Sequence, residues 1–139
     1  MPMTVWVVAA LVLSLPRSFV LSAHATDTAP LPGPPGLSTV EEFRSWRAPG
    51  GRELFLFVWQ PRAARDLGPM QSTAEWPATA AGQPVKIFET AMFMGRQQRV
   101  LVTYLHLAAP EANAMLYAKG IDRAEFEALL GGVSIAGKR

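Results

Sequence analysis

The residue best suited to acid–base catalysis is His106, because the other histidine, His24, lies in the N-terminal segment that we predict below to be cleaved. A serine triad would have to use His106 as its base. No Gly-x-Ser-x-Gly motif accompanies it, and the acidic pair Glu41-Glu42 suits helix capping. The sequence therefore predicts that the protein is not an enzyme. The alternative is an enzyme with an unrecognised site that uses His106 or a loop carboxylate.

Metal and cofactor chemistry finds little support in the sequence. The lack of cysteine excludes thiolate metal sites and iron–sulfur clusters, and no His-x-His, His-Glu-x-x-His or phosphate-binding loop is present. Met92 and Met94 could bind Cu(I) if His106 joined them. A hairpin turning near Gly95 would, however, hold His106 about 20 Å from Met92 at the usual rise per strand residue. We therefore predict no metal and no cofactor.

The strongest candidate for binding is a long connection and its flanks, at residues 59–76. Trp59, Arg62, Arg65, Asp66 and Trp76 lie within it. Tryptophan and arginine are enriched at binding hot spots, and the planar guanidinium suits carboxylates and phosphates. These residues predict a partner that is another protein or a small anionic ligand. In the alternative interpretation the tryptophans fill the core while the arginines pair with Asp66 and with solvent.

Length and charge limit the range of functions. The chain has 139 residues, which suits a single domain, and its formal net charge is only +2. No block of like charge exceeds two residues, so a nucleic-acid partner is not expected. Together with the missing catalytic motifs, this composition predicts a small non-catalytic binding or accessory domain.

The N-terminal segment resembles a targeting signal. Residues 5–15 form an almost unbroken apolar run that Pro16 and Arg17 end. The run is about half the 20 residues of a membrane-spanning helix and has the length of a signal peptide's apolar region. Ala23 and Ala25 occupy the two positions that a signal peptidase reads. Residues 1–25 are therefore predicted to be a signal peptide, and the protein to be periplasmic or secreted. The alternative is a membrane-tethered accessory subunit that keeps residues 5–21 as an uncleaved anchor.

A stiff linker is expected to follow the predicted signal. Residues 26–37 contain four prolines and two glycines, which is incompatible with a helix or a central strand. A single domain is then predicted over residues 38–135.

The first half of this domain is predicted to contain a helix and a buried strand. Ser38 or Thr39 can cap a helix that ends before Pro49. Residues 52–60 are predicted to form a strand, and every residue of its centre, 54–59, is apolar, which indicates a central strand covered on both faces. A connection follows at residues 61–83, with one helical turn expected at 72–76.

The second half is predicted to contain a hairpin and a closing helix. Residues 84–94 and 99–107 alternate as strands around a turn. We favour a strand at residues 110–119, although Pro110 and Gly120 leave a helix open. Asp122 and Glu125 form a capping box for a helix that Gly131-Gly132 ends. The predicted class is α+β, with a small, mostly antiparallel sheet of three or four strands and a helix at each end packed on one face.

Overall fold

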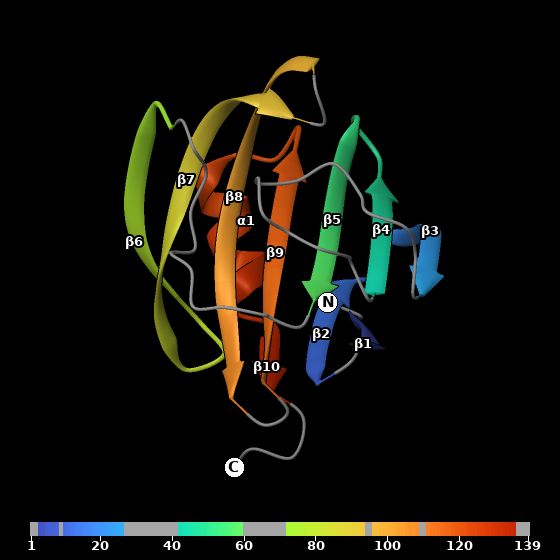
Figure 1. The fold of residues 1–139 in the computed structure, drawn as a ribbon. Coiled ribbons are helices and arrows are strands. Elements are labelled where there is room, and N and C mark those ends of the chain that lie inside the picture. Colours follow the sequence, from blue (N-terminus) through green and yellow to red (C-terminus); the bar gives the residue numbers. More distant parts are fainter. Residues whose placement is uncertain are drawn as a thin grey trace.

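The structure is a computed structural model that describes residues 3–8, 10–26, 42–59, 72–93, 96–108 and 111–135. Within these ranges the chain forms ten strands and one helix (Figure 1). In chain order they are β1 (Met3–Val8), β2 (Leu11–Pro16), β3 (Val20–Thr26), β4 (Glu42–Ala48), β5 (Arg52–Trp59), β6 (Ala74–Ala80), β7 (Gln83–Phe93), β8 (Arg96–Ala108), β9 (Glu111–Lys119), α1 (Arg123–Leu130) and β10 (Val133–Ile135).

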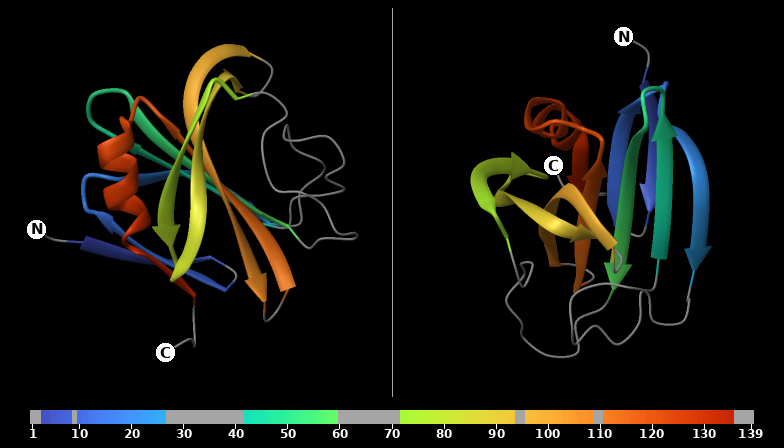
Figure 2. Two further views of the ribbon diagram at one scale, coloured as in Figure 1. Left: turned by 90° about the vertical axis from the view of Figure 1, so that its left-hand side faces the viewer. Right: turned by 90° about the horizontal axis from the view of Figure 1, so that it is seen from above.

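The strands form two antiparallel sheets. The larger has seven strands in the order β3-β4-β5-β9-β8-β7-β6, and the smaller has three in the order β1-β2-β10. In Figure 2, α1 and the three-stranded sheet lie on one side of the seven-stranded sheet and cover that face. The main core lies between these two layers.

The predicted α+β class is wrong. The structure is mostly β, with a seven-stranded and a three-stranded sheet, and its described part contains a single helix. The error has two sources. Residues 42–48 form a strand in place of the predicted first helix, and residues 3–26, which the prediction placed ahead of the fold as a signal peptide, form three strands.

The β4 strand forms because its neighbours in space override its local helical pattern. It pairs along its length with both β3 and β5, and Trp46 is fully buried between the layers. The turn to β5 uses Gly50 and Gly51, both with positive φ, a conformation that glycine adopts without steric cost. The helical turn expected at residues 72–76 is also wrong, because Ala74–Ala80 is the strand β6.

The N-terminal segment supplies a large share of the core. Leu11, Leu13 and Leu15 alternate along β2 with less buried residues, and each is fully buried, as is Phe19. They belong to one cluster with the buried side chains of α1, which are Phe126, Leu129 and Leu130. Alternation of this kind is what a strand with one covered face requires. Cleavage after Ala25 is not tested by the fold and stays a prediction.

Other predicted elements are confirmed. The central strand at residues 52–60 is β5, the hairpin is formed by β7 and β8, and the favoured strand at 110–119 is β9. The closing helix is α1: the Asp122 side chain accepts a hydrogen bond of 2.8 Å from the backbone N–H of Glu125. No helix in the described ranges is long and apolar enough to cross a membrane.

A tight backbone approach joins β2 to the turn after α1. The N–H of Ser14 donates to the carbonyl oxygen of Gly132 at 2.8 Å, and a Cβ added at Gly132 would overlap the Ser14 carbonyl oxygen. Gly132→Ala should therefore destabilise the protein by about 1–3 kcal/mol, the usual cost of overpacking. Chemical denaturation would measure this effect. Gly131→Ala is the matched control, because its Cβ would lie 3.2 Å from the Ala128 oxygen and 3.9 Å from the Glu127 oxygen, both longer than the overlapping distance at Gly132. Equal stabilities for the two variants would contradict the contact with β2.

The second face of the seven-stranded sheet carries an aromatic cluster. Phe57, Val102, Tyr104 and Met115 are buried there, and Phe57 contacts Tyr117 edge-on at 5.8 Å between ring centres. Burial is the main cause that raises the pKa of Tyr104 far above its ordinary value, and neighbouring Tyr117 raises it further. Burial also raises the pKa of Tyr117.

These two residues are the chain's only tyrosines, which makes the shift measurable. A spectrophotometric titration of tyrosinate should show no ionisation near pH 10, the ordinary range. Because the folded-state pKa is raised, the associated stability is fully present below about pH 10 and declines as pH rises towards the folded-state pKa. Ionisation should thus accompany unfolding. A reversible step near pH 10 in the folded protein would contradict the burial.

Candidate binding cavity

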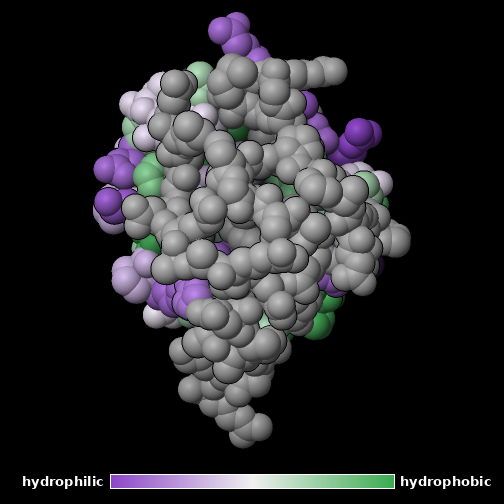
Figure 3. All heavy atoms as spheres, in the orientation of Figure 1, coloured by the Kyte–Doolittle hydropathy of each residue, from purple (hydrophilic) through white to green (hydrophobic). Residues whose placement is uncertain are grey.

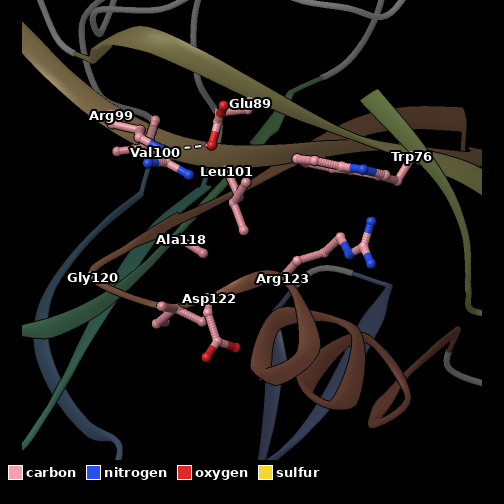
Figure 4. Close-up of a pocket in the computed structure, with 10 residues that line it drawn as sticks. Trp76, Glu89, Arg99, Val100, Leu101, Ala118, Gly120, Asp122 and Arg123 are labelled. Carbon is pink, nitrogen blue, oxygen red and sulfur yellow. Dashed lines mark hydrogen bonds and ion pairs between the residues drawn. The ribbon is translucent and has the colours of Figure 1, made fainter. Parts of the chain in front are cut away.

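A cavity of about 490 Å³ opens between the outer strands of the large sheet and the start of α1 (Figure 4). We call it the Trp76 cavity. Its lining comes from β6, β7, β8, β9 and the turn into α1, and consists of Trp76, Glu89, Arg99, Val100, Leu101, Ala118, Gly120, Ile121, Asp122 and Arg123. Its size is within the range of small-molecule sites, about 300–1,000 Å³.

The strand register explains how distant residues meet in this cavity. Glu89 pairs with Leu101, and Leu101 pairs with Ala118, so these three lie in one row across β7, β8 and β9. Side chains in such a row point to the same face of the sheet. Trp76 pairs with Ile87 in the next row. The cavity therefore depends on the sheet order and is not a local feature of one loop.

The inner wall of the cavity is apolar. Leu101, Ala118 and Ile121 are all buried and belong to the main core cluster. Gly120 adds a close approach, since its φ is positive and a Cβ there would meet the Gly51 carbonyl oxygen at 2.6 Å. An apolar wall with a few polar groups at its rim is the usual composition of a ligand site.

Arg123 and Trp76 form the most distinctive contact at the rim. The central guanidinium carbon of Arg123 lies 4.9 Å from the centre of the Trp76 ring, which is a cation–π distance. Figure 4 shows the Arg123 side chain extending from α1 towards Trp76. Arg123 also lies 3.8 Å from Glu127, a distance longer than a hydrogen bond. This cation–π contact holds the guanidinium group against the Trp76 ring at the rim of the cavity.

The acidic residues at the rim have partners of their own. Glu89 forms an ion pair with Arg99 through one carboxylate oxygen and accepts a hydrogen bond of 3.0 Å from Thr73 through the other. The Asp122 side chain caps α1 by accepting a hydrogen bond from the backbone N–H of Glu125. Helix N-termini favour negative charge, and here Asp122 supplies it. Arg123 is thus the rim cation best placed to meet an added anion.

The position of α1, and with it Arg123, is fixed from two sides. Arg52 of β5 forms an ion pair with Glu125 and lies 5.3 Å from the centre of the Phe19 ring. On its other face α1 buries Phe126, Leu129 and Leu130 in the core that includes the leucines of β2. The N-terminal strands therefore support the wall of the cavity.

The predicted site residues fall in different places. Trp76 lines the cavity, whereas Trp59 ends β5, with three strands of the sheet between it and β6. The side chain of Trp59, and Arg62, Arg65 and Asp66 as a whole, lie outside the described residues. Whether those residues form a binding surface is untested.

Sequence reasoning missed Arg99 and Arg123. Arg123 is 47 positions beyond Trp76, and nothing local links the two residues. The sequence predicts that Arg123 follows the helix cap at Asp122, but it does not predict β6, the strand whose Trp76 contacts Arg123. The candidate catalytic residue His106 is exposed on β8, with its Nδ1 3.1 Å from Oδ1 of Asn113. Among the residues that the structure describes, no group of His, Asp or Glu could hold a metal ion.

Comparison of the chain with protein-family models, with curated proteins and with solved structures found no match.

Proposed function

We propose that this protein is a non-catalytic binding domain that holds a small planar organic anion in the Trp76 cavity. The observation that carries the proposal is the cation–π contact of Arg123 with Trp76 at the rim of an apolar cavity. The ligand's negative group would meet the guanidinium edge of Arg123, and its apolar body would lie against Leu101, Ala118 and Ile121. A carboxylate suits the guanidinium best, because the two can pair through parallel N–H···O bonds.

The geometry favours a small ligand over a protein partner at this position. The volume of the cavity suits a molecule of a few to some tens of atoms, and its few polar residues surround an apolar wall. A protein partner would need a larger surface, about 800 Å² on each side. Of the two partners expected from the sequence, the cavity therefore supports the small anion.

Binding can be tested with a matched panel of ring compounds. Isothermal titration calorimetry and native mass spectrometry of the full chain would compare benzoate, phenylacetate and phenyl phosphate with neutral benzamide and cationic benzylamine. At least one of the three anions should bind more tightly than both benzamide and benzylamine. Trp76→Leu should weaken that binding, because leucine keeps an apolar side chain but removes the aromatic face. Equal affinity for anions and benzamide would reject the proposed role of charge.

A further inference from the structure

Among the described residues, the first strand of the small sheet, β1, has one edge without a partner strand and one exposed face. β1 pairs with β2 and with no other strand in the part of the chain that the structure describes. Its alternate residues are exposed, with Met3 at 47%, Val5 at 61% and Val7 at 65%. Figure 2 shows β1 at the outside of the molecule, and Figure 3 shows hydrophobic surface at the lower right, where Figure 1 places β1. Together these three side chains expose apolar surface on the order of 300 Å², a size at which a surface patch often has a function.

The features that usually protect an edge strand are missing from β1. Neither β1 nor β2 contains a charged residue, and β1 contains no proline. The large sheet has two edge strands. β6 carries both devices, exposed Glu75 and Pro77, whereas β3 has neither but carries the polar residues Ser22 and His24. The opposite edge of the small sheet, β10, has only three residues. Natural proteins block exposed edges by such means, so an unblocked apolar edge indicates a pairing site.

From this edge we infer that two copies of the chain pair through their β1 strands and form one continuous six-stranded sheet. The sequence of β1 is self-complementary in the antiparallel arrangement. When Val5 of one copy lies opposite Val5 of the other, Met3 lies opposite Val7, and all three exposed residues fall on one face. The two-fold axis then passes beside Val5. Because β1 and β2 carry no ionisable side chain, two copies meet without like-charge repulsion.

The contact is independent of the proposed ligand site but requires that β1 remains on the chain. The exposed stripe is smaller than the roughly 800 Å² that each partner buries in a standard interface. The backbone hydrogen bonds of the paired edges add to it, whereas the outer face of β2 takes no part, because edge pairing extends the sheet in its own plane. A weak dimer, with a Kd on the order of micromolar, is therefore expected. In the symmetric contact each β1 edge is paired with the β1 edge of the other copy, so no free β1 edge remains and association stops at two copies.

The test is analytical ultracentrifugation of the full chain over micromolar concentrations. The wild-type chain should shift from monomer to dimer as concentration rises. Val5→Lys should raise the dimer Kd by more than about tenfold, because the two introduced charges lie opposite each other across the axis. Val20→Lys is the matched control. Val20 lies on β3 and is 62% exposed, so the same substitution there should leave the Kd unchanged.

A charge-swap experiment makes the register itself testable. An equimolar mixture of Val5→Lys and Val5→Glu chains should form a heterodimer, although each chain alone is monomeric. Circular dichroism would show that both variants are folded. A wild-type chain that stays monomeric, including one that binds to anionic phospholipid vesicles as a monomer, would overturn the inference. Association beyond two copies, or a dimer that persists in Val5→Lys, would do the same.

Discussion

A chain that begins at Thr26 should fail to fold. It would lose β1, β2 and nearly all of β3, and with them four fully buried side chains: Leu11, Leu13, Leu15 and Phe19. Removing one buried leucine side chain costs about 2–5 kcal/mol, and whole domains are stable by only about 5–15 kcal/mol. Circular dichroism and one-dimensional NMR of the truncated chain should therefore show an unfolded or aggregated protein.

Point variants test the same expectation without a deletion. Leu13→Ala should lower the free energy of unfolding by about 2–5 kcal/mol, since Leu13 lies in the core with Phe126 and Leu130. Val20→Ala is the matched control in the same N-terminal segment. Val20 is 62% exposed on β3, so its change should stay within about 0.5 kcal/mol. Urea denaturation measures both variants. If Leu13→Ala were as harmless as Val20→Ala, residues 11–15 would not be part of the core.

This expectation bears directly on the predicted signal peptide. Cleavage after Ala25 would remove β1, β2 and nearly all of β3, so the cleaved chain could not keep the fold described here. The fold of the uncleaved chain does not test cleavage or export, and both stay predictions. The intact mass of the protein expressed with its own N-terminus would show whether the cell produces the cleaved or the uncleaved chain.

Arg123→Ala should weaken anion binding by about 10–100-fold, which corresponds to the roughly 1.5–3 kcal/mol of a hydrogen bond to a charged group. The same change removes the cation–π contact with Trp76 at the rim and the 3.8 Å ion pair with Glu127. Fold stability should change little, since exposed helix ion pairs contribute only about 0.3–0.5 kcal/mol. Titration calorimetry with the tightest anion of the panel measures the effect.

Two further variants separate charge from shape in this result. Arg123→Lys keeps the charge but loses the planar donor edge, so its affinity should lie between wild type and Arg123→Ala. Arg47→Ala removes an exposed arginine on β4, which does not line the cavity, and should leave binding unchanged. If Arg47→Ala and Arg123→Ala weakened binding equally, the anion would respond to net charge and not to the Trp76 cavity.

The elements that the sequence predicted correctly carry their signals locally. β5, β7 and β8 show strand patterns over eight or more residues, and α1 has its cap and its glycine stop within a dozen positions. Such patterns do not depend on which distant strand pairs with them. They were sufficient for the antiparallel hairpin and the closing helix.

The errors arise where two structures share one sequence pattern. A signal peptide's apolar region and a buried hairpin are both short apolar runs, and the run at residues 5–15 satisfied both descriptions. The alternation of Leu11, Leu13 and Leu15 with Val12 and Ser14 was the available sign of a strand. For β4, pairing with β3 and β5 decides the structure, and a helix cap before it gives no indication of that pairing.

The candidate site could be predicted only in part. Trp76 was singled out because tryptophan is common at binding sites, but the arginine that contacts it comes from α1. That contact depends on the order of the sheet and on how α1 packs across it, which no spacing in the sequence encodes. The site is therefore a product of the whole fold, including its N-terminal strands.

Hydrogen–deuterium exchange of the full-length chain tests most directly whether residues 3–26 belong to the folded domain. Backbone amides in residues 11–15 should exchange as slowly as those of β8 and β9, because β2 pairs with β1 and β10 and its leucines lie in the same core. Exchange in residues 11–15 at the rate of an unstructured peptide, while β8 and β9 stay protected, would contradict the account. The N-terminal segment would then be an appendage, and neither the support of α1 nor the pairing of β1 would stand.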